Sequence, residues 1–553
     1  MTRPRPGAAL ALPWARGWRA LTLQLLLIVL TALPGQAHGA GSGDAGEAIF
    51  RRGQLATGAA LEAHRDGGLY MQGADAACIN CHRRSGLGAK VGLSSIPPIT
   101  GRYLFRPQNG EDPDLPFVDG VRNGRDAYTD ATVARAIREG LDSQGQPLSY
   151  LMPRFTMSDF DMAALIGYLK GLDQRKTPGV METELHFATI ITPDADPTKR
   201  RGMLDVLEHY FAEKNTFPIG ATPALRSSRK MMYMANRHWQ LHVWQLNGPE
   251  STWQQQLQQH LAAEPVFAVI SGLGGKNWAP VHAFCEQAAL PCLFPNVDAP
   301  VDHPSDFYSI YFSGGVLLEA RLIAKSLLAP ENRKAAKSVL QIYRANDSGE
   351  TGAKALATAL RPHGIATSGY TLRPGESVAM ALRHSRHADA LVLWLRPADI
   401  AALGPQPPPA PAGVFLSGLL GGLEQAPLPA GWRDVTHIAY PVDLPERRRV
   451  RVDYAFGWFS IRHIPVVAEQ MQADTFLACG LLAETLSHMS GTFVRDYLVE
   501  RIEDMIEHRL ITGYYPRLTL AQGQRFASKG GFMVHFTKPD NPALAADGDW
   551  MVP

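Results

Sequence analysis

Two thiols and an imidazole stand at a spacing suited to holding a prosthetic group. Cys78, Cys81 and His82 form the pattern Cys-x-x-Cys-His. Two thiols on one short turn can reach both vinyl groups of a porphyrin while the adjacent imidazole points at the iron. A disulfide redox motif would sit in a βαβ context, and a zinc site would need a second Cys or His pair nearby. Neither context is evident, so the pattern predicts one covalently attached haem c.

The iron of such a haem needs a second axial ligand, and residues 148–162 contain three methionines. Met152 is the best placed, because it stands directly before Pro153. Core packing or an exposed helix start accounts better for Met157 and Met162. The predicted iron ligands are therefore His82 and Met152. An iron with both axial positions filled by protein is suited to one-electron transfer without binding substrate.

Residues 42–173 resemble the class I cytochromes c. The resemblance rests on Met-Pro-x-Phe at 152–155 with the helical stretch that follows it, on a first helix containing Gly46, Phe50 and Gly53, and on the turn at 96–101. It implies an all-α cytochrome c domain in which Met152 ligates the iron. It also implies that the carbonyl of Pro97 accepts the N–H of His82 and orients the ring.

The first forty residues are typical of a Sec-type signal peptide. Four arginines precede the apolar residues 20–33, and small residues follow at 34–40. The apolar run is short and impure for a bilayer span of about 20 residues. We expect cleavage, a soluble protein in the bacterial periplasm, and no stable membrane span afterwards. The formal net charge of +2, with 19% charged residues, suggests no nucleic-acid partner.

After a polar linker at 174–184, apolar strands alternate with amphipathic helices through residues 185–553. Predicted strands lie at 185–191, 241–246, 266–270, 292–294, 338–343, 390–395 and 413–416, with helices at 197–215, 253–262, 279–288, 316–328 and 352–360. This alternation implies βαβ units and two α/β lobes. The region resembles the type I periplasmic solute-binding proteins, in the leucine/amino-acid-binding branch associated with ABC transporters. The stretches that carry this resemblance are 187–192, 267–272, 289–296, 515–520 and 528–530.

Ligands of open α/β lobes gather at the carboxyl ends of strands, here facing a cleft between the lobes. Polar residues and glycine at these ends are the candidate ligand contacts: Ser271, Gly272, Asn296, Asp298, Ser313, Asp347 and Ser348. Such residues are also ordinary turn and helix-cap residues. A complete set of amino-acid-binding groups is not evident. The expected ligand is a small polar organic molecule, or the cleft is empty.

The other cysteines have different surroundings. Cys285 and Cys292 are close enough in sequence for a disulfide if the turn between them is tight, and the sequence leaves this open. Cys479 lies in an apolar helical stretch and is expected to be a buried thiol.

Three functions are compatible with these features. The first is a periplasmic electron carrier whose solute-binding-like module senses a ligand or docks a redox partner, such as a dehydrogenase or another cytochrome. The second is an ABC-transport-type solute-binding protein with an appended cytochrome. The third, a haem-dependent oxidoreductase, is disfavoured because Met152 would close the iron. No catalytic residue is predicted.

Overall fold

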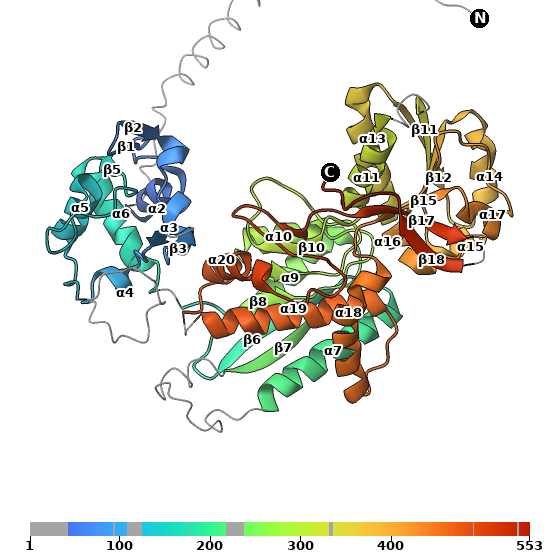
Figure 1. Cartoon of the computed structure of the whole chain (residues 1–553). Helices are drawn as coiled ribbons and strands as arrows, with labels where there is room; N and C mark the ends of the chain where they lie inside the picture. The colour runs from blue at the N-terminus through green and yellow to red at the C-terminus, as the bar shows by residue number, and fades with distance from the viewer. Residues whose placement is uncertain are drawn as a thin grey trace, which may run out of the picture.

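The computed structural model describes residues 42–91, 94–107, 124–174, 176–216, 237–330, 336–489, 492–538 and 541–553. The predicted signal peptide and residues 108–123 of the polar insert lie outside these ranges. The described chain forms an N-terminal unit followed by two α/β lobes (Figure 1). Within the described ranges, no helix has both the length and the apolar character needed to cross a bilayer.

The N-terminal unit contains three longer helices and two small antiparallel sheets. Its elements are α2 (Ser42–Arg52), β1 (Glu62–Arg65), β2 (Leu69–Gln72), α3 (Ile79–His82), β3 (Ala89–Val91), β4 (Ser94–Ile96), α4 (Gly101–Leu104), α5 (Asp130–Glu139), β5 (Arg154–Thr156) and α6 (Asp159–Gly171). The prediction of an all-α domain is therefore wrong, because the unit also contains these two small sheets. Asp66-Gly67-Gly68 turns β1 into β2, and both glycines adopt the positive φ that such a tight turn requires.

Helices α2 and α6 cross at close range, which gives the unit its core. A Cβ on Gly46 would lie 2.2 Å from the carbonyl oxygen of Ala164, so only glycine permits this approach. The rings of Phe50 and Tyr168 meet beside the crossing, with centroids 5.3 Å apart. The first helix expected from Gly46, Phe50 and Gly53 is present and makes this contact, but it ends at Arg52, so Gly53, with a φ of 61°, lies just beyond it.

The first lobe is a parallel six-stranded sheet in the order β16-β10-β9-β8-β6-β7. Strand β6 is an almost continuous apolar run, as expected for a strand covered on both faces. The lobe comprises β6 (Glu184–Ile191), α7 (Pro197–Thr216), β7 (His238–Gln245), α9 (Trp253–Ala263), β8 (Ala268–Ile270), α10 (Ala279–Gln287), β9 (Cys292–Leu293), β10 (Ser309–Ser313), α18 (Pro445–Ile461), α19 (Glu469–His488), α20 (Arg495–Met505) and β16 (Phe526–Ser528).

The second lobe has seven strands in the order β12-β11-β13-β14-β15-β17-β18, and only the last two pairings are antiparallel. It comprises α11 (Gly315–Leu327), β11 (Ser338–Arg344), α13 (Ser348–Leu360), β12 (Ala366–Leu372), α14 (Val378–Leu382), β13 (Ala390–Trp394), α15 (Pro397–Ala401), β14 (Val414–Ser417), α16 (Gly418–Gly421), α17 (Ala430–Arg433), β15 (Thr436–Tyr440), β17 (Phe532–Lys538) and β18 (Asn541–Ala546). Short 3-10 turns, among them Leu423–Gln425, complete it.

The described chain passes between the lobes three times, at residues 313–315, 440–445 and 528–532. Helices α18 to α20 return to the first lobe, where α19 packs on α7. Three short crossings near one another allow two rigid lobes to rotate about a common hinge. This confirms the two-lobe α/β architecture expected from the alternation of strands and helices.

Candidate functional site

The Cys-x-x-Cys-His pattern forms a single helical turn, α3, with Cys78 at its N-cap. Neither Cys78 nor Cys81 is in a disulfide. The His82 ring is buried, and its Nδ1 lies 3.0 Å from the carbonyl oxygen of Pro97. Burial lowers the pKa of His82 to about 4, against the opposing effect of the Pro97 carbonyl. The imidazole is therefore neutral near pH 7, with Nδ1–H donating to Pro97 and Nε2 left without a hydrogen bond to any described residue.

The three candidate methionines differ in their packing. Met157 and Met162 belong to the buried core of the N-terminal unit, with 9% and 3% of their surface exposed. Met152 is only partly buried and lies against the same core, as does Cys78. This packing agrees with a core role for Met157 and Met162. The assignment of Met152 as an iron ligand stays a prediction.

The loop that directly follows His82 is fastened to helix α20 of the first lobe. Arg83 pairs with Glu503 at 2.5 Å, and Glu503 also accepts from Arg525. One helical turn earlier, Glu500 accepts hydrogen bonds from the backbone N–H of Ser85 at 3.0 Å and from its hydroxyl at 2.5 Å. Burial raises the pKa of Glu500 to about 8, although Ser85 and Arg83 act in the opposite direction.

Further contacts widen this junction between the N-terminal unit and the first lobe. The Arg84 guanidinium lies 4.1 Å from the centroid of the Phe307 ring. Arg51 pairs with Asp496 of α20 at 3.2 Å. Leu87 is part of the same buried cluster as the apolar residues of the lobes. The unit that carries the motif is thus packed onto the first lobe over both charged and apolar contacts.

The carboxyl ends of parallel strands from both lobes meet at a cleft of about 1050 Å³. Four of the seven candidate ligand residues line it: Asn296, Asp298, Ser313 and Asp347. Asn296 donates from Nδ2 to the hydroxyls of Ser271 at 2.9 Å and Thr475 at 3.3 Å. The rule that ligand-facing residues follow parallel strands therefore places four side chains on this surface.

The other three candidates, Ser271, Gly272 and Ser348, do not line the cleft, which differs from the prediction that they contact a ligand. Ser271 is fully buried, and its hydroxyl donates to Thr475, so it supports Asn296. Gly272 packs under Trp278, where a Cβ would lie 2.6 Å from the indole ring. Ser348 is fully buried at the start of α13. Small residues at strand ends can serve packing as well as binding, and a sequence does not separate the two roles.

Arg396 was not predicted from the sequence. Its guanidinium pairs with one carboxylate of each lobe, across the cleft. Its Nη2 lies 2.7 Å from Asp298, in the first lobe, and 2.7 Å from Asp347, in its own lobe. Burial alone would lower the pKa of Arg396, but the two carboxylates raise it above its usual value. Arg396 is the second residue after the end of β13. The rule that selected Asp347 at a strand end could therefore have selected Arg396 as well.

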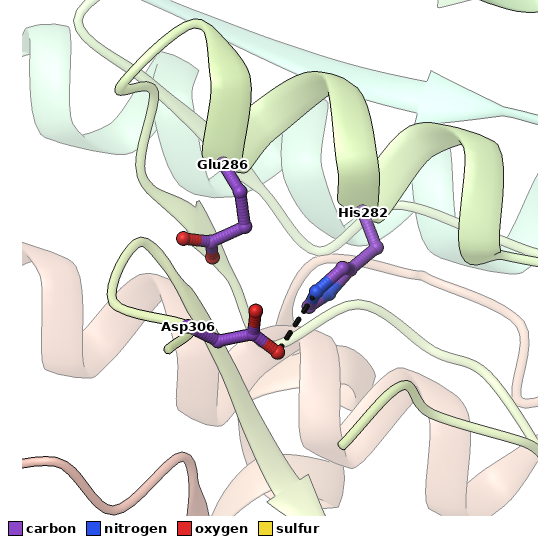
Figure 2. A group of neighbouring side chains, drawn as sticks. All are labelled: His282, Glu286 and Asp306. Carbon is purple, nitrogen blue, oxygen red and sulfur yellow. Dashed lines mark ion pairs between the residues drawn. The ribbon is translucent and has the colours of Figure 1, made fainter. Parts of the chain in front are cut away.

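A cluster of His282, Glu286 and Asp306 has the residue types of a metal site (Figure 2). His282 Nε2 lies 3.0 Å from Asp306, and its Nδ1 lies 2.8 Å from the Tyr311 hydroxyl, so both ring nitrogens have partners. The Glu286 carboxylate accepts from the backbone N–H groups of residues 307, 308 and 309. The cluster holds the entrance to β10 in place, and no lone pair of the imidazole is left for a metal.

The remaining cysteines are free thiols. Cys285 and Cys292 are both buried, and burial, together with the neighbouring Cys292, raises the pKa of Cys285. The structure has no disulfide between Cys285 and Cys292, and the two side chains are neighbours. Cys479 is buried in α19, as expected.

No protein-family model matches the chain, and no curated protein matches it. Three solved structures that align with the chain are a substrate-binding protein of an ABC transporter, a substrate-binding periplasmic protein and a leucine-binding protein. A fatty acid ABC transporter substrate-binding protein from Thermomonospora curvata aligns with a TM-score of 0.47 and 13% identity over 68% of this chain and 95% of that chain. A substrate-binding periplasmic protein from Ralstonia solanacearum gives 0.49 and 13% over 66% and 100%.

A leucine-binding protein from Thermotoga maritima aligns with a TM-score of 0.45 and 12% identity, over 66% of this chain and 98% of that chain. At these scores and identities the likeness establishes neither a shared family nor a shared ligand. The haem remains a prediction from the motif.

Proposed function

We propose that the two-lobe module binds a small polar organic molecule in the cleft between its lobes, as a solute-binding protein. The observation that carries this proposal is the meeting of strand ends from both lobes at one cleft, where the Arg396 guanidinium pairs with a carboxylate of each lobe. Its volume is close to the roughly 300–1,000 Å³ of small-molecule sites. A hinge of three short crossings lets a ligand draw the lobes together.

Native mass spectrometry after mild purification tests this proposal. The expected result is a retained molecule beyond the polypeptide and any haem, which dissociates when the protein is unfolded. Small-angle scattering should then give a larger radius of gyration once the molecule is removed, because the lobes separate. If neither a retained molecule nor any effect of millimolar metabolites on melting temperature and radius is found, the module is a docking scaffold and the proposal fails.

A second proposal is that the N-terminal unit holds one covalent haem c, which would supply one-electron redox chemistry. Cys78 and Cys81 would attach it, and His82 and Met152 would ligate the iron. The pair of free thiols on one helical turn and the neutral His82, with its Nδ1 committed to Pro97, fit such a group. Pro97 orients the imidazole ring, and burial keeps it in the form that binds a metal.

A pyridine haemochrome spectrum of the purified protein tests this second proposal. We expect the spectrum of covalent haem, weakened or lost in Cys78→Ala and Cys81→Ala. Met152→Ala should remove the weak sulfur-to-iron band of the ferric spectrum, whereas the matched control Met157→Ala should keep it. Non-covalent haem, or none, would contradict the attachment, and loss of the band in the control alone would contradict the choice of methionine.

Of the two functions, we propose the solute-binding protein with an appended haem unit, because the cleft is formed by described residues whereas the haem is predicted from the motif alone. For either function we propose a periplasmic location, with a dehydrogenase or another cytochrome as redox partner. Co-purification separates the two. Capture of an ABC permease supports the transport function, and capture of a redox enzyme alone supports the electron carrier.

A further inference from the structure

One carboxylate in the cleft is buried and only half hydrogen-bonded. Asp474, in the second turn of α19, lines the cleft with 7% of its surface exposed. Its Oδ2 accepts from the Tyr515 hydroxyl at 3.0 Å. Its Oδ1 has no partner at hydrogen-bond distance and angle among the described residues, although the Gln470 side chain, which also lines the cleft, is near enough to act on the carboxylate. A buried acceptor without a donor is costly, and native proteins rarely keep one unless a ligand or water completes it.

Aromatic rings surround this carboxylate. Tyr514 and Tyr515 line the cleft together with Phe312. The rings of Tyr515 and Phe312 stack with centroids 5.5 Å apart, and Phe312 in turn stacks on Phe294 at 4.2 Å. This stacked row fixes the Tyr515 ring and so the position of its hydroxyl. Aromatic faces next to a carboxylate attract cations, and they also accept an apolar group.

The charged groups nearby are mainly acidic. Glu469 on the same helix and Glu424 from the second lobe lie on the cleft surface with Asp474. Arg448 of α18 lies under the Tyr514 ring, but it is paired with Glu424 at 2.6 Å and bonded to the Tyr440 hydroxyl at 2.6 Å. No described cation pairs with Asp474. Burial raises the pKa of Asp474 to about 7, while Tyr515 and Gln470 act to lower it.

We propose that Asp474, with the rings of Tyr514 and Tyr515, forms a subsite for the ammonium group of an organic amine. The inference rests on the proposed binding function of the cleft and names the chemical class of its ligand. The ammonium donates to the unpartnered Oδ1 and supplies the missing positive charge. The aromatic rings cover the carbon atoms next to the nitrogen.

Three probes with one carbon skeleton test the subsite: phenethylamine, 2-phenylethanol and phenylacetate. They carry a cation, a neutral hydroxyl and an anion. Isothermal titration of the full-length protein should detect the amine only. In Asp474→Asn, affinity for phenethylamine should fall about tenfold or more, since each factor of ten is about 1.4 kcal/mol and a charged hydrogen bond exceeds this. Asp453→Asn is the matched control, an exposed carboxylate of the adjacent helix α18 that does not line the cleft, and should change affinity less than about threefold.

Two further readouts distinguish binding from folding. Amine binding should release a proton near pH 7, because the ammonium favours the ionised carboxylate, and the heat should therefore differ between phosphate and Tris buffers. Without ligand, Asp474→Asn should raise the melting temperature more at pH 8 than at pH 5. The folded protein holds a proton on Asp474 up to about pH 7, so its stability falls as the pH rises toward that value, and the amide removes this loss.

The outcomes separate this inference from the function it rests on. If phenylacetate or 2-phenylethanol binds as tightly as the amine, or if Asp474→Asn keeps its affinity for the amine, the subsite is refuted while cleft binding stands. If no probe binds but mass spectrometry finds a retained molecule without an amine, the ligand class is wrong. If no molecule of any kind binds, the proposed function itself fails.

Discussion

The most demanding consequence of the structure concerns Glu503, the carboxylate shared by the N-terminal unit and the first lobe. It accepts from Arg83 on one side and from Arg525 on the other. The side chains of Glu503, Arg83 and Arg525 are 2%, 10% and 4% exposed, so solvent screens their charges little. Replacing Glu503 with Gln keeps the size of the side chain and removes the charge that both guanidinium groups face.

The expected cost follows from what is left behind. Removing one partner of a buried ion pair typically costs about 3–5 kcal/mol, because the other charge stays buried and unpaired. The amide oxygen of Gln can still accept one hydrogen bond, and Asp504 lies 3.9 Å from Arg83. These two remaining interactions reduce the expected free-energy cost to the lower end of that range, about 3 kcal/mol. If separating the N-terminal unit from the first lobe costs less free energy than this, the unit separates instead, and water then hydrates Arg83.

Hydrogen exchange with peptide resolution reports either result. A loss of about 3 kcal/mol corresponds to roughly hundredfold faster exchange wherever the junction opens. The informative amide is that of Ser85, which donates to Glu500. The control is Arg138→Met, which breaks a pair in the same unit whose side chains are 35% and 96% exposed and should cost under about 1 kcal/mol. Equal protection of Ser85 in Glu503→Gln and the control, with an unchanged radius, would refute the view that this pair fastens the unit to the lobe.

Three further results are expected. Arg396→Gln should enlarge the ligand-free radius of gyration, because it removes the contact of Arg396 with Asp298 across the cleft; an unchanged scattering curve would contradict this. Burial raises the pKa of Glu319 to about 8, so the folded state keeps a proton that the unfolded state loses, and stability should fall between about pH 4.5 and 8. Glu319→Gln should flatten urea midpoints over that window, and an unaltered slope would count against it. Gly46→Ala should destabilise by about 1–3 kcal/mol or more through overpacking, whereas Gly167→Ala, which meets no neighbour, should gain up to about 1 kcal/mol in thermal unfolding; similar midpoints would contradict the close crossing of α2 and α6.

Regular alternation of apolar strands and helices was enough to predict seven of the thirteen described strands of the module. Strands β6, β8, β11 and β13 are buried on both faces, so their sequences are nearly continuous apolar runs, and their predicted bounds agree with the structure to within two residues. Strands β10, β15, β16, β17 and β18 were not predicted, and neither was β12. It lies at the edge of its sheet, mostly exposed, and its residues include Gly369 and three polar side chains. An edge strand has little need for apolar residues, so hydrophobic patterning does not reveal it.

The candidate site was predicted in part, for a related reason. Asn296, Asp298 and Asp347 follow predicted strands, and such a position is readable in a sequence. Ser313 is the last residue of β10, which was not predicted. Asp474 lies inside a helix, and its only signal is a charged residue among apolar neighbours. The junction joins Arg83 to Glu503 and Arg525, which are hundreds of positions away. Such pairings are set by how the finished units pack, so a single sequence without homologues offers no way to find them.

These contacts also decide which parts of the molecule can move together. Arg51, Arg83 and Ser85 all bond to α20, which belongs to the first lobe. The described polar bonds of the motif loop to the rest of the protein go to that lobe, so rotation of the second lobe about the three crossings leaves them intact. A ligand shifts the open and closed populations only by its differential affinity, about 1.4 kcal/mol for a tenfold preference. Closure would then leave the His82 turn and its contacts with α20 unaltered.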